Sequence, residues 1–409
     1  MDCQPNLVQP LLLNNKVAHN TINLESLTPT VAFTSYTSAS IMPLQLNVKK
    51  TEGGKPGKVY YPLELKEVPK PTPGPKQLLI RYHAAALNHR DLFIRQHLYP
   101  GISFDAPMLA DGYATVVSGP AHLIGKAVLP TPSRGWRADQ DGPEDLSKFA
   151  VCGSAITYED AGTAREYAAI DADEVELAPE HLSPIEGAAL PLVGLTAWRA
   201  VVVKAGISPT VNPLDPRKNV LITGIGGGVA LAALQFAVNM NCRVWVTSGT
   251  ADKIERAKQL GAEGGVNYRD ADWDNQLAQM LPKVRPFLDA IIDGAGGDIV
   301  KRSLRVLKSG GIISSYGMTT GPKMDWVMQA VLKHIEIRGT TMGSRKDYRD
   351  MIEFVRKKEI KPVVSRVVKG LDNLEGIEGL FDDLIAGKQF GKLVVEIAPQ
   401  DMNSKASKL

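Results

Sequence analysis

The segment from Asn219 to Met240 constrains the fold of this 409-residue chain more than any other part of the sequence. It begins with the apolar run NVLIT, continues through the glycine-rich stretch GIGGG and ends with VALAALQFAVNM. Leu231, Leu234 and Val238 recur at helical spacing in the last part, which predicts a helix. A buried strand ending at Thr223, a glycine turn and a helix therefore follow one another.

The turn has the glycine pattern of a phosphate-binding site. Gly224, Gly227 and Ala230 stand in steps of three, which suits a tight turn, the close approach of a pyrophosphate, and the packing of helix on strand. The N–H groups and the dipole at the start of the helix, around Gly228 and Val229, stabilise negative charge. An ordinary tight turn is the alternative, but the position between a strand and a helix favours dinucleotide binding.

Short apolar strands alternate with helical segments after Pro184, which predicts a doubly wound parallel sheet. The strands are NVLITG, RVWVTSG, GVNY, LDAIIDGAG and GGIISSYG, and they are continuously apolar because both faces of such a sheet are covered. Residues 49–177 instead alternate short β-rich runs with Pro and Gly, which indicates an irregular β domain. The sequence therefore predicts an α/β protein with two domains.

The end of the second strand indicates which dinucleotide is bound. A site that selects NADH places a carboxylate there to bind the ribose hydroxyls. Here the strand ends in Thr247-Ser248-Gly249, without a carboxylate. Ser248 can hydrogen-bond a 2′-phosphate, and Lys253 and Arg243 can supply positive charge, although a solvated lysine in the first turn of a helix is the alternative for Lys253. We therefore expect NADPH rather than NADH.

Charge and composition exclude several classes of protein. The 47 Lys and Arg against 44 Asp and Glu leave a net charge of +3, without the basic cluster that a nucleic-acid interface requires. The cysteines Cys3, Cys152 and Cys242 are too few and too widely spaced for a disulfide framework. No stretch approaches the roughly 18 apolar residues of a membrane span. We expect a small-molecule partner and no binding to nucleic acid or membrane.

Both ends of the chain are expected to lie outside the fold. Residues 1–41 are rich in Ser, Thr and Asn, and we interpret them as a disordered extension before a true start at Met42. They contain no Arg, which argues against a mitochondrial presequence. Residues 399–409 form a polar tail that ends in Ser407-Lys408-Leu409, the address read by the peroxisomal import receptor. The prediction is a peroxisomal protein, with the cytoplasm as the alternative.

Seven segments together resemble the medium-chain dehydrogenase/reductase superfamily, in particular its zinc-free quinone oxidoreductase and enoyl reductase branch. They follow the family's order: AALNHRDLFIRQHLYPG, GKAVLP, AALPLVGLTAWRAV, VLITGIGGGVALAALQ, KQLGAEGGVNY, DAIIDGAGG and FGKLVVEI. The resemblance implies a Rossmann domain over 192–343 and a catalytic β domain of the chaperonin-10, or GroES-like, type, split into 42–191 and a return segment, 344–398. It also implies that Tyr268 lies near the adenosine phosphate of the cofactor.

The resemblance also indicates where zinc-dependent members bind their catalytic metal. They use an early Cys, a His-Glu pair after a glycine, and a later Cys or acidic ligand, since a catalytic zinc site needs three protein ligands. The corresponding stretches here are LNHRD at 87–91, ADG at 110–112 and, for the later ligand, Leu192. The four-cysteine lobe of the structural zinc site is also missing. We therefore expect no metal.

Without a metal, the cofactor carries the hydride and the protein must position and polarise the acceptor. Hydride transfer to a quinone or enone leaves negative charge on an oxygen, which requires a nearby donor. The resemblance implies that Tyr99 in QHLYP is the proton donor, as in the GxYP-type segment of enoyl reductases, although His97 replaces the usual glycine. It also places Asn88 and Asp91 beside the nicotinamide. Simple packing beneath a loop is the alternative for Tyr99.

Two later turns complete the predicted cofactor site. Gly294 in DGAGG follows one apolar strand, and Gly317 in SSYG follows the next. We expect both to pass close to the cofactor, the alternative being that the turns alone require glycine.

These features favour an NADPH-dependent, zinc-independent oxidoreductase that reduces a quinone, enone or 2-enoyl compound. An alcohol or aldehyde oxidoreductase of the same superfamily is the alternative among enzymes, and a non-catalytic NADPH-binding redox sensor is the alternative outside them. A homodimer that pairs edge strands is a further prediction, for which GGIISSYG and HIEIRGTTMG supply suitable strands. A covered edge would be the simpler explanation of those strands.

Overall fold

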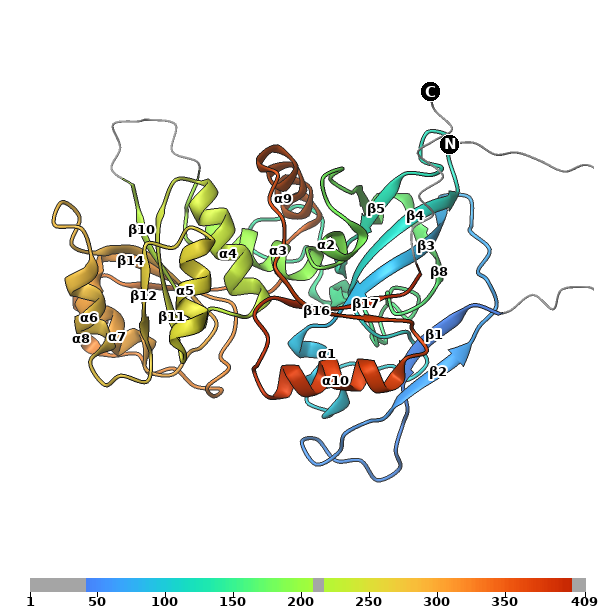
Figure 1. The fold of residues 1–409 in the computed structure, drawn as a ribbon, viewed down its shortest axis with the longest axis horizontal. Helices are drawn as coiled ribbons and strands as arrows, with labels where there is room; N and C mark the ends of the chain where they lie inside the picture. Colours follow the sequence, from blue (N-terminus) through green and yellow to red (C-terminus); the bar gives the residue numbers. More distant parts are fainter. Residues whose placement is uncertain (1–41, 209–216, 399–409) are drawn as a thin grey trace, which may run out of the picture. The chain divides into compact units, whose positions relative to one another are not determined.

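The computed structural model of the protein describes residues 42–208 and 217–398. The predicted N-terminal extension and the C-terminal Ser407-Lys408-Leu409 lie outside the described residues. Within the described ranges, no helix combines the length and the apolar composition that a membrane crossing requires. Two large sheets organise this part of the chain (Figure 1).

The first sheet has six strands, all paired in parallel, in the order β12-β11-β10-β13-β14-β15. This order confirms the predicted doubly wound sheet, with the change of direction at β10 and β13. The strands are β10 (Asn219–Ile222), β11 (Arg243–Ser248), β12 (Gly264–Asn267), β13 (Leu288–Asp293), β14 (Leu307–Ser315) and β15 (Glu336–Gly339).

Both faces of this sheet are buried, as its continuous apolar strands require. Val220 and Ile222 of β10 pack in one core, while Leu221 between them packs in another. The connecting helices are α4 (Gly228–Asn239), α5 (Ala251–Gln259), α6 (Trp273–Met280), α7 (Ile299–Val306) and α8 (Met328–Leu332). Residues of α4 belong to the first core, and residues of α6 and α7 to the second.

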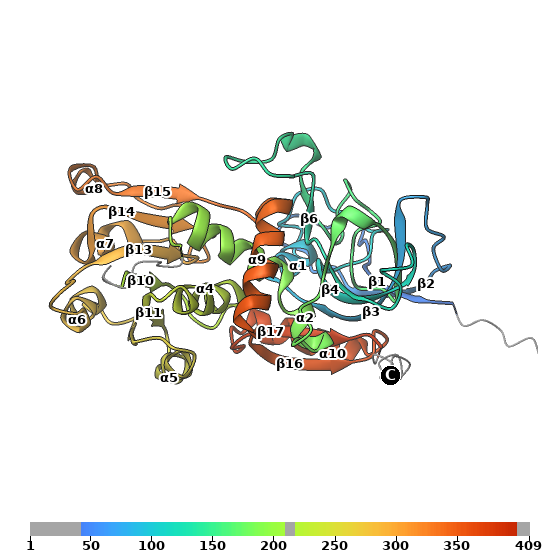
Figure 2. The ribbon, with the colours of Figure 1, turned by 90° about the horizontal axis from the view of Figure 1, so that it is seen from above.

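The second sheet is mainly antiparallel, in the order β16-β17-β3-β4-β5-β9, and β8 also pairs with β3. Figure 2 shows β16 and β17 of this sheet side by side. Val395 of β17 lies opposite Ala85 of β3, so the last described strand returns to the domain that the first described strands form. Two small pairs, β1 with β2 and β6 with β7, complete the β structure. The strands are β1 (Leu44–Val48), β2 (Leu63–Glu67), β3 (Gln77–Ala86), β4 (Asp111–Ser118), β5 (Ala127–Pro130), β6 (Ser133–Arg134), β7 (Ala150–Val151), β8 (Tyr167–Asp171), β9 (Val175–Leu177), β16 (Val364–Lys369) and β17 (Lys392–Glu396).

An aromatic cluster connects the helices that lie between the two sheets. Trp198, Phe236 and Phe354 contact one another with ring centroids 5.3, 5.9 and 6.0 Å apart, a favourable range for aromatic pairs. These residues come from α3, α4 and α9, respectively. The remaining α-helices of the described chain are α1 (His89–Arg95), α2 (Pro184–Ala188), α3 (Pro191–Trp198), α9 (Arg345–Lys358) and α10 (Leu374–Ile385). α3 continues as a π-helical segment (Arg199–Lys204), and two short 3-10 helices span Leu146–Lys148 and Ala172–Glu174.

The strands proposed for a homodimer differ in their positions. β15, which lies within HIEIRGTTMG, is an edge of the parallel sheet, whereas β14, which contains GGIISS, pairs on both sides. Only the β15 edge of this pair is open to another strand. The homodimer itself remains a prediction.

Candidate active site

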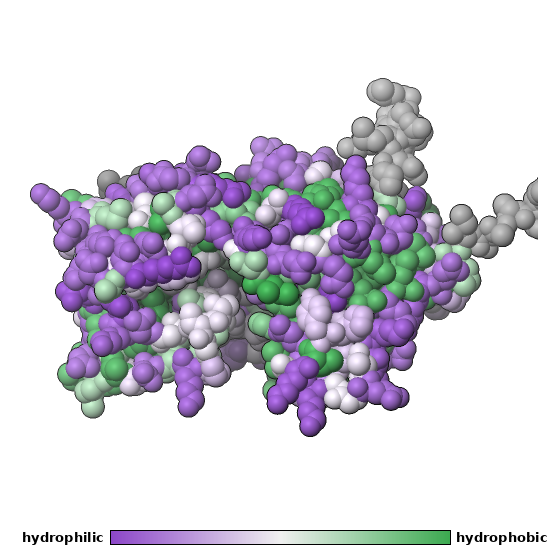
Figure 3. All heavy atoms as spheres, turned by 60° about the horizontal axis from the view of Figure 1, so that its bottom comes forward, coloured by the Kyte–Doolittle hydropathy of each residue, from purple (hydrophilic) through white to green (hydrophobic). Residues whose placement is uncertain are grey.

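A cleft of about 620 Å³ lies between the two sheets and contains most of the predicted site residues (Figure 3). No Asp or Glu is among the described residues that line it, while Arg90, Lys253, Arg269 and Lys392 are. The cleft is therefore suited to an anionic ligand. The predicted residues that line it are Asn88, Tyr99, Gly224, Gly227, Gly228, Val229, Ser248, Lys253, Tyr268, Gly294 and Gly317.

The glycine turn leaves the start of α4 open to this cleft. Gly224 and Gly226 have φ angles of 63° and 124°, which glycine adopts without strain. A Cβ on Gly228 would lie 2.8 Å from the Val193 side chain and 3.0 Å from that of Lys392. Ala230 is buried in the core beneath, where a small side chain lets helix pack on strand. The turn and the α4 N-terminus thus fit a pyrophosphate.

Two basic residues and a tyrosine surround the end of β11. A Cβ on Gly249 would lie 2.7 Å from the Tyr268 hydroxyl oxygen and 3.1 Å from the Arg269 guanidinium carbon. Arg269 donates to the Gly249 carbonyl (3.1 Å), and Lys253 donates to the Gly387 carbonyl (2.8 Å). Sequence reasoning missed Arg269, although it directly follows Tyr268 in VNYR.

The expectation that Arg243 supplies charge to the cofactor is wrong. Arg243 begins β11 and Ser248 ends it, so at about 3.3 Å per residue they lie about 16 Å apart. The Arg243 guanidinium donates instead to the Arg217 carbonyl (3.4 Å).

A buried ion pair forms the floor of the cleft beside α1. The Lys392 ammonium donates to the Leu87 carbonyl (2.6 Å), the Asn88 side-chain oxygen (2.7 Å) and the Asp111 carboxylate (2.8 Å). Asp111 also accepts from the Asn88 side-chain nitrogen (2.8 Å) and the Leu192 backbone N–H (2.7 Å). Lys392 is 4% exposed and Asp111 is fully buried, so the charges neutralise one another out of water. Both polar atoms of the Asn88 side chain are therefore paired within the protein, and its amide stabilises the ion pair.

This ion pair joins the three stretches that correspond to zinc ligands in zinc-dependent members. Asn88, Asp111 and Leu192 all take part in it, and Lys392 places a positive charge at its centre. An ammonium there repels a divalent cation, and Leu192 offers only a backbone N–H. In the part of the chain that the structure describes, no group of three or more His, Cys, Asp or Glu could hold a metal ion. These residues fit an ion pair rather than a catalytic metal.

The prediction that Asp91 lines the nicotinamide side of the cleft is wrong. Asp91 is fully buried, and its carboxylate accepts the backbone N–H of Asn88 (2.8 Å), which caps the start of α1. It also lies 3.4 Å from the Arg90 guanidinium. A residue three positions after a helix N-cap commonly turns back toward the cap, and that signal was present in NHRD.

Asp91 is expected to make stability depend on pH. Burial raises the pKa of Asp91 from 3.8 to about 6, so the folded protein keeps the proton over a range in which the unfolded chain has lost it. The Asp91 contribution to the free energy of unfolding therefore falls as pH rises from about 4 to about 6, by up to about 3 kcal/mol. The free energy of unfolding, measured with urea from pH 4 to pH 6, should show this fall in wild type and not in Asp91→Asn. The same pH dependence in both proteins would contradict a raised pKa of Asp91.

Tyr99 lies in the cleft with its ring 4.7 Å from the Arg90 guanidinium. His97, which replaces the usual glycine, adopts a left-handed backbone with φ of 54°. Its Nδ1 lies 2.7 Å from the Tyr61 hydroxyl oxygen, an interaction that fixes the turn. The turn before Tyr99 is thus formed without glycine.

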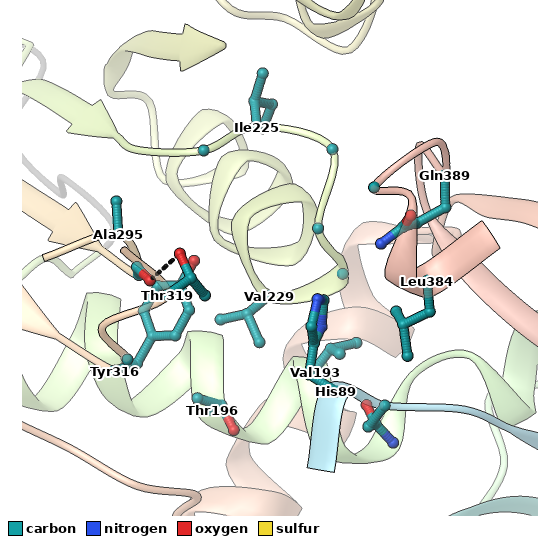
Figure 4. Close-up of a pocket in the computed structure, with 18 of the residues that line it drawn as sticks. His89, Val193, Thr196, Ile225, Val229, Ala295, Tyr316, Thr319, Leu384 and Gln389 are labelled. Atoms are coloured by element: carbon teal, nitrogen blue, oxygen red, sulfur yellow. Dashed lines mark hydrogen bonds between the residues drawn. The ribbon is translucent and has the colours of Figure 1, made fainter. Parts of the chain in front are cut away.

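The two later glycine turns meet at the edge of the cleft. A Cβ on Gly294 would lie 2.5 Å from the Tyr316 hydroxyl oxygen, and Gly317 approaches the Gly294 backbone. Thr319 donates to the Gly294 carbonyl (3.3 Å; Figure 4). Gly294 therefore leaves room for the Tyr316 side chain, and Gly317 lets the two turns approach closely.

Further lining residues were missed by sequence reasoning. His89 lines the cleft, and its side chain points into it (Figure 4). Burial, followed by the nearby Lys392 charge, lowers the pKa of His89, which favours its neutral form. Thr196 lines the cleft from α3. His89 stands beside Asn88 in a recognised motif, whereas Thr196 and Gln389 carry no comparable sequence signal.

Comparison with known proteins identifies the family. The alcohol dehydrogenase GroES-like domain matches residues 74–180, and the zinc-binding dehydrogenase family matches residues 228–357. YogA of Leptosphaeria maculans, a zinc-type alcohol dehydrogenase-like protein, is 53% identical over 365 residues, which cover 87% of this chain and 100% of that protein. The chain belongs to the medium-chain dehydrogenase/reductase superfamily. A zinc-type alcohol dehydrogenase-like protein of Schizosaccharomyces pombe is 30% identical over 303 residues, 72% of this chain and 84% of the relative.

Solved structures of medium-chain dehydrogenases/reductases have the same fold. An NAD-dependent alcohol dehydrogenase matches with a TM-score of 0.74 and 29% identity over 87% of this chain and 100% of that one. Crotonyl-CoA carboxylase/reductase AntE in complex with NADP matches with a TM-score of 0.69 and 19% identity, over 89% of this chain and 96% of that one, which supports the fold alone. As a member of this superfamily, the protein is an oxidoreductase that uses a pyridine nucleotide.

Proposed function

We propose that this protein is an NADPH-dependent reductase of a quinone, enone or 2-enoyl compound and works without zinc. The observation that carries the proposal is the buried ammonium of Lys392, which lies among the residues that replace the zinc ligands of zinc-dependent members. The names of the relatives mention zinc and alcohol. An alcohol oxidoreductase is therefore the second candidate.

The preference for NADPH rests on the charges around the end of β11. Ser248, Lys253 and Arg269 line the cleft there, and no carboxylate does so among the described residues. A 2′-phosphate would gain charge-assisted hydrogen bonds from the two basic residues. A ribose without the phosphate would lack the acidic partner of an NADH site.

When bound, NADPH supplies the hydride, and the protein positions the acceptor and provides its proton. Phe93, Val151, Leu192 and Met342 contribute apolar walls, which favour a neutral, conjugated acceptor and limit water. The Tyr99 hydroxyl donates a proton to the acceptor as negative charge develops on it. Arg90 holds the tyrosine ring from one face, which orients this donor.

Tyr99→Phe is expected to reduce turnover about 100-fold, since the substitution removes the proton donor and retains the ring. The dissociation constant for NADPH should stay close to that of wild type. Stopped-flow NADPH oxidation and fluorescence titration measure the two quantities. Wild-type turnover in this variant would remove Tyr99 from the mechanism.

A panel of acceptors tests the function itself. NADPH oxidation is measured with benzoquinones, enones and 2-enoyl thioesters, and alcohol oxidation is measured separately with NADP⁺ and NAD⁺. Turnover with one of the first three classes supports the proposal. Efficient alcohol oxidation with none of these reductions would favour the second candidate, and tight NADPH binding without any turnover would favour a redox sensor.

A further inference from the structure

The turn that follows α1 holds a histidine in a backbone conformation that favours glycine. Gln96 ends the helix, and His97 after it has a left-handed backbone with φ of 54°. The His97 N–H donates to the Ile94 carbonyl (3.0 Å), and the Leu98 N–H donates to the Phe93 carbonyl (2.7 Å). These two hydrogen bonds form a Schellman motif, in which glycine usually takes the left-handed position. A residue with a Cβ is strained there, so the turn itself does not explain the histidine.

The His97 side chain contacts Tyr61, which belongs to the segment between β1 and β2. Nδ1 of His97 lies 2.7 Å from the Tyr61 hydroxyl oxygen, and the two ring centroids are 5.6 Å apart. Tyr61 is buried, and Phe104 packs edge-on against its ring with the centroids 4.9 Å apart. The Tyr61 N–H donates to the Arg95 carbonyl (2.7 Å), and Arg95 Nε donates to the Tyr61 carbonyl (2.8 Å). Tyr61 is therefore a fixed support for the imidazole.

A second histidine of the described chain occupies the same kind of turn without such a support. His334 follows α8 with φ of 56°. Its N–H donates to the Val331 carbonyl (2.9 Å), and the Ile335 N–H donates to the Ala330 carbonyl (3.0 Å). The His334 side chain is exposed and forms no hydrogen bond with a described residue. A histidine can thus form this turn without the side-chain contact that His97 makes.

We infer that His97 and Tyr61 position the Tyr99 hydroxyl for proton donation. Tyr99 lies two residues beyond His97 and lines the cleft, with the Arg90 guanidinium 4.7 Å from its ring centroid. Neither His97 nor Tyr61 is among the described residues that line the cleft, so both act through Tyr99. Arg90 holds the tyrosine ring while the imidazole contact holds its backbone, which keeps the hydroxyl in the geometry that proton transfer needs. The inference deepens the proposed function and rests on it.

His97→Gly tests this role, because glycine suits the left-handed turn and the variant should fold. Its kcat with the best acceptor of the panel should fall about 10-fold, since the turn no longer holds the Tyr99 hydroxyl in place. The KM for the acceptor and the dissociation constant for NADPH should stay close to the wild-type values. Tyr61→Phe removes only the hydroxyl that contacts the imidazole, and it should lower kcat by the same factor. The two changes together should lower kcat no more than either change alone.

Two further variants separate positioning from a general effect of the substitution. His334→Gly makes the same change in the same kind of turn, at a residue that is not among those described as lining the cleft, and it should keep the wild-type kcat. Tyr99→Phe has no hydroxyl to position. Adding His97→Gly to Tyr99→Phe should therefore leave kcat at the value of Tyr99→Phe alone.

Steady-state kinetics gives distinct outcomes for the two proposals. If wild type reduces an acceptor and His97→Gly has the wild-type kcat, the positioning role is overturned while the proposed function stands. A further fall in kcat when His97→Gly is added to Tyr99→Phe would also overturn the positioning role, because His97 would then act independently of Tyr99. An equal fall in kcat in His334→Gly would overturn it as well. If wild type reduces none of the acceptors, the proposed function fails and the positioning role fails with it.

Discussion

Lys392→Met is expected to lower the free energy of unfolding by about 3–5 kcal/mol, because it leaves the buried Asp111 carboxylate without its counter-charge. Lys392 donates three hydrogen bonds of 2.6–2.8 Å, and no other cation contacts Asp111 in the described chain. The Leu87 carbonyl and the Asn88 side chain lose a partner at the same time. Urea denaturation followed by circular dichroism measures the change.

A double variant separates the charge effect from simple loss of packing. Lys392→Met with Asp111→Leu removes both charges, so it should be more stable than Lys392→Met alone. Lys388→Met, at an exposed position in the preceding loop, is the matched control and should unfold as wild type does. The single variant Asp111→Leu is measured as well. If the double variant loses as much free energy of unfolding as the two single variants together, the result would contradict a coupled ion pair.

A double variant, Lys253→Ala with Arg269→Ala, is expected to raise the dissociation constant for NADPH about 100-fold or more. Its dissociation constant for NADH should change much less. Each basic side chain lines the cleft near the end of β11, where the 2′-phosphate of NADPH is proposed to lie. A hydrogen bond to a charged group contributes about 1.5–3 kcal/mol. Both hydrogen bonds are made to the 2′-phosphate, which NADPH carries and NADH lacks, so their loss weakens NADPH binding only. Fluorescence titration with each nucleotide measures the effect.

Lys258→Ala is the matched control for this loss of charge. Lys258 is exposed on α5 and pairs with Glu255 (3.0 Å), so its removal should leave both affinities unchanged. An equal loss of NADH and NADPH affinity in the Lys253 and Arg269 variant would contradict recognition of the 2′-phosphate. Unchanged NADPH affinity in that variant would also contradict recognition of the 2′-phosphate by these two residues.

The parallel sheet and the phosphate turn could be predicted because their signals are local. A strand, a glycine-rich turn and a helix lie in one stretch, and the alternation of strands with helices indicates a parallel sheet. Gly224, Gly227 and Gly228 consequently line the cleft as expected. The β domain was also foreseeable as a class, from its short strands and frequent Pro and Gly.

The rest of the site depends on contacts between distant residues. Lys392 reaches Asp111 across 281 positions of the chain, and no local pattern indicates that partnership. Asp91 stands in the same motif as Asn88, yet its carboxylate turns away from the cleft because it accepts the Asn88 backbone N–H at the N-cap of α1. Gln389 faces the cleft because its segment is fixed against the Gly226 turn. A residue's place in a motif therefore does not show whether its side chain lines the cleft or only supports the fold.

Metal analysis combined with an activity assay tests whether this cleft reduces its acceptor without zinc. Protein purified without chelator is analysed for zinc, and NADPH oxidation with the best quinone or enone is then measured before and after dialysis against EDTA. We expect less than stoichiometric zinc and the same turnover after dialysis. One zinc per chain, with turnover lost on dialysis and restored by added zinc, would contradict it.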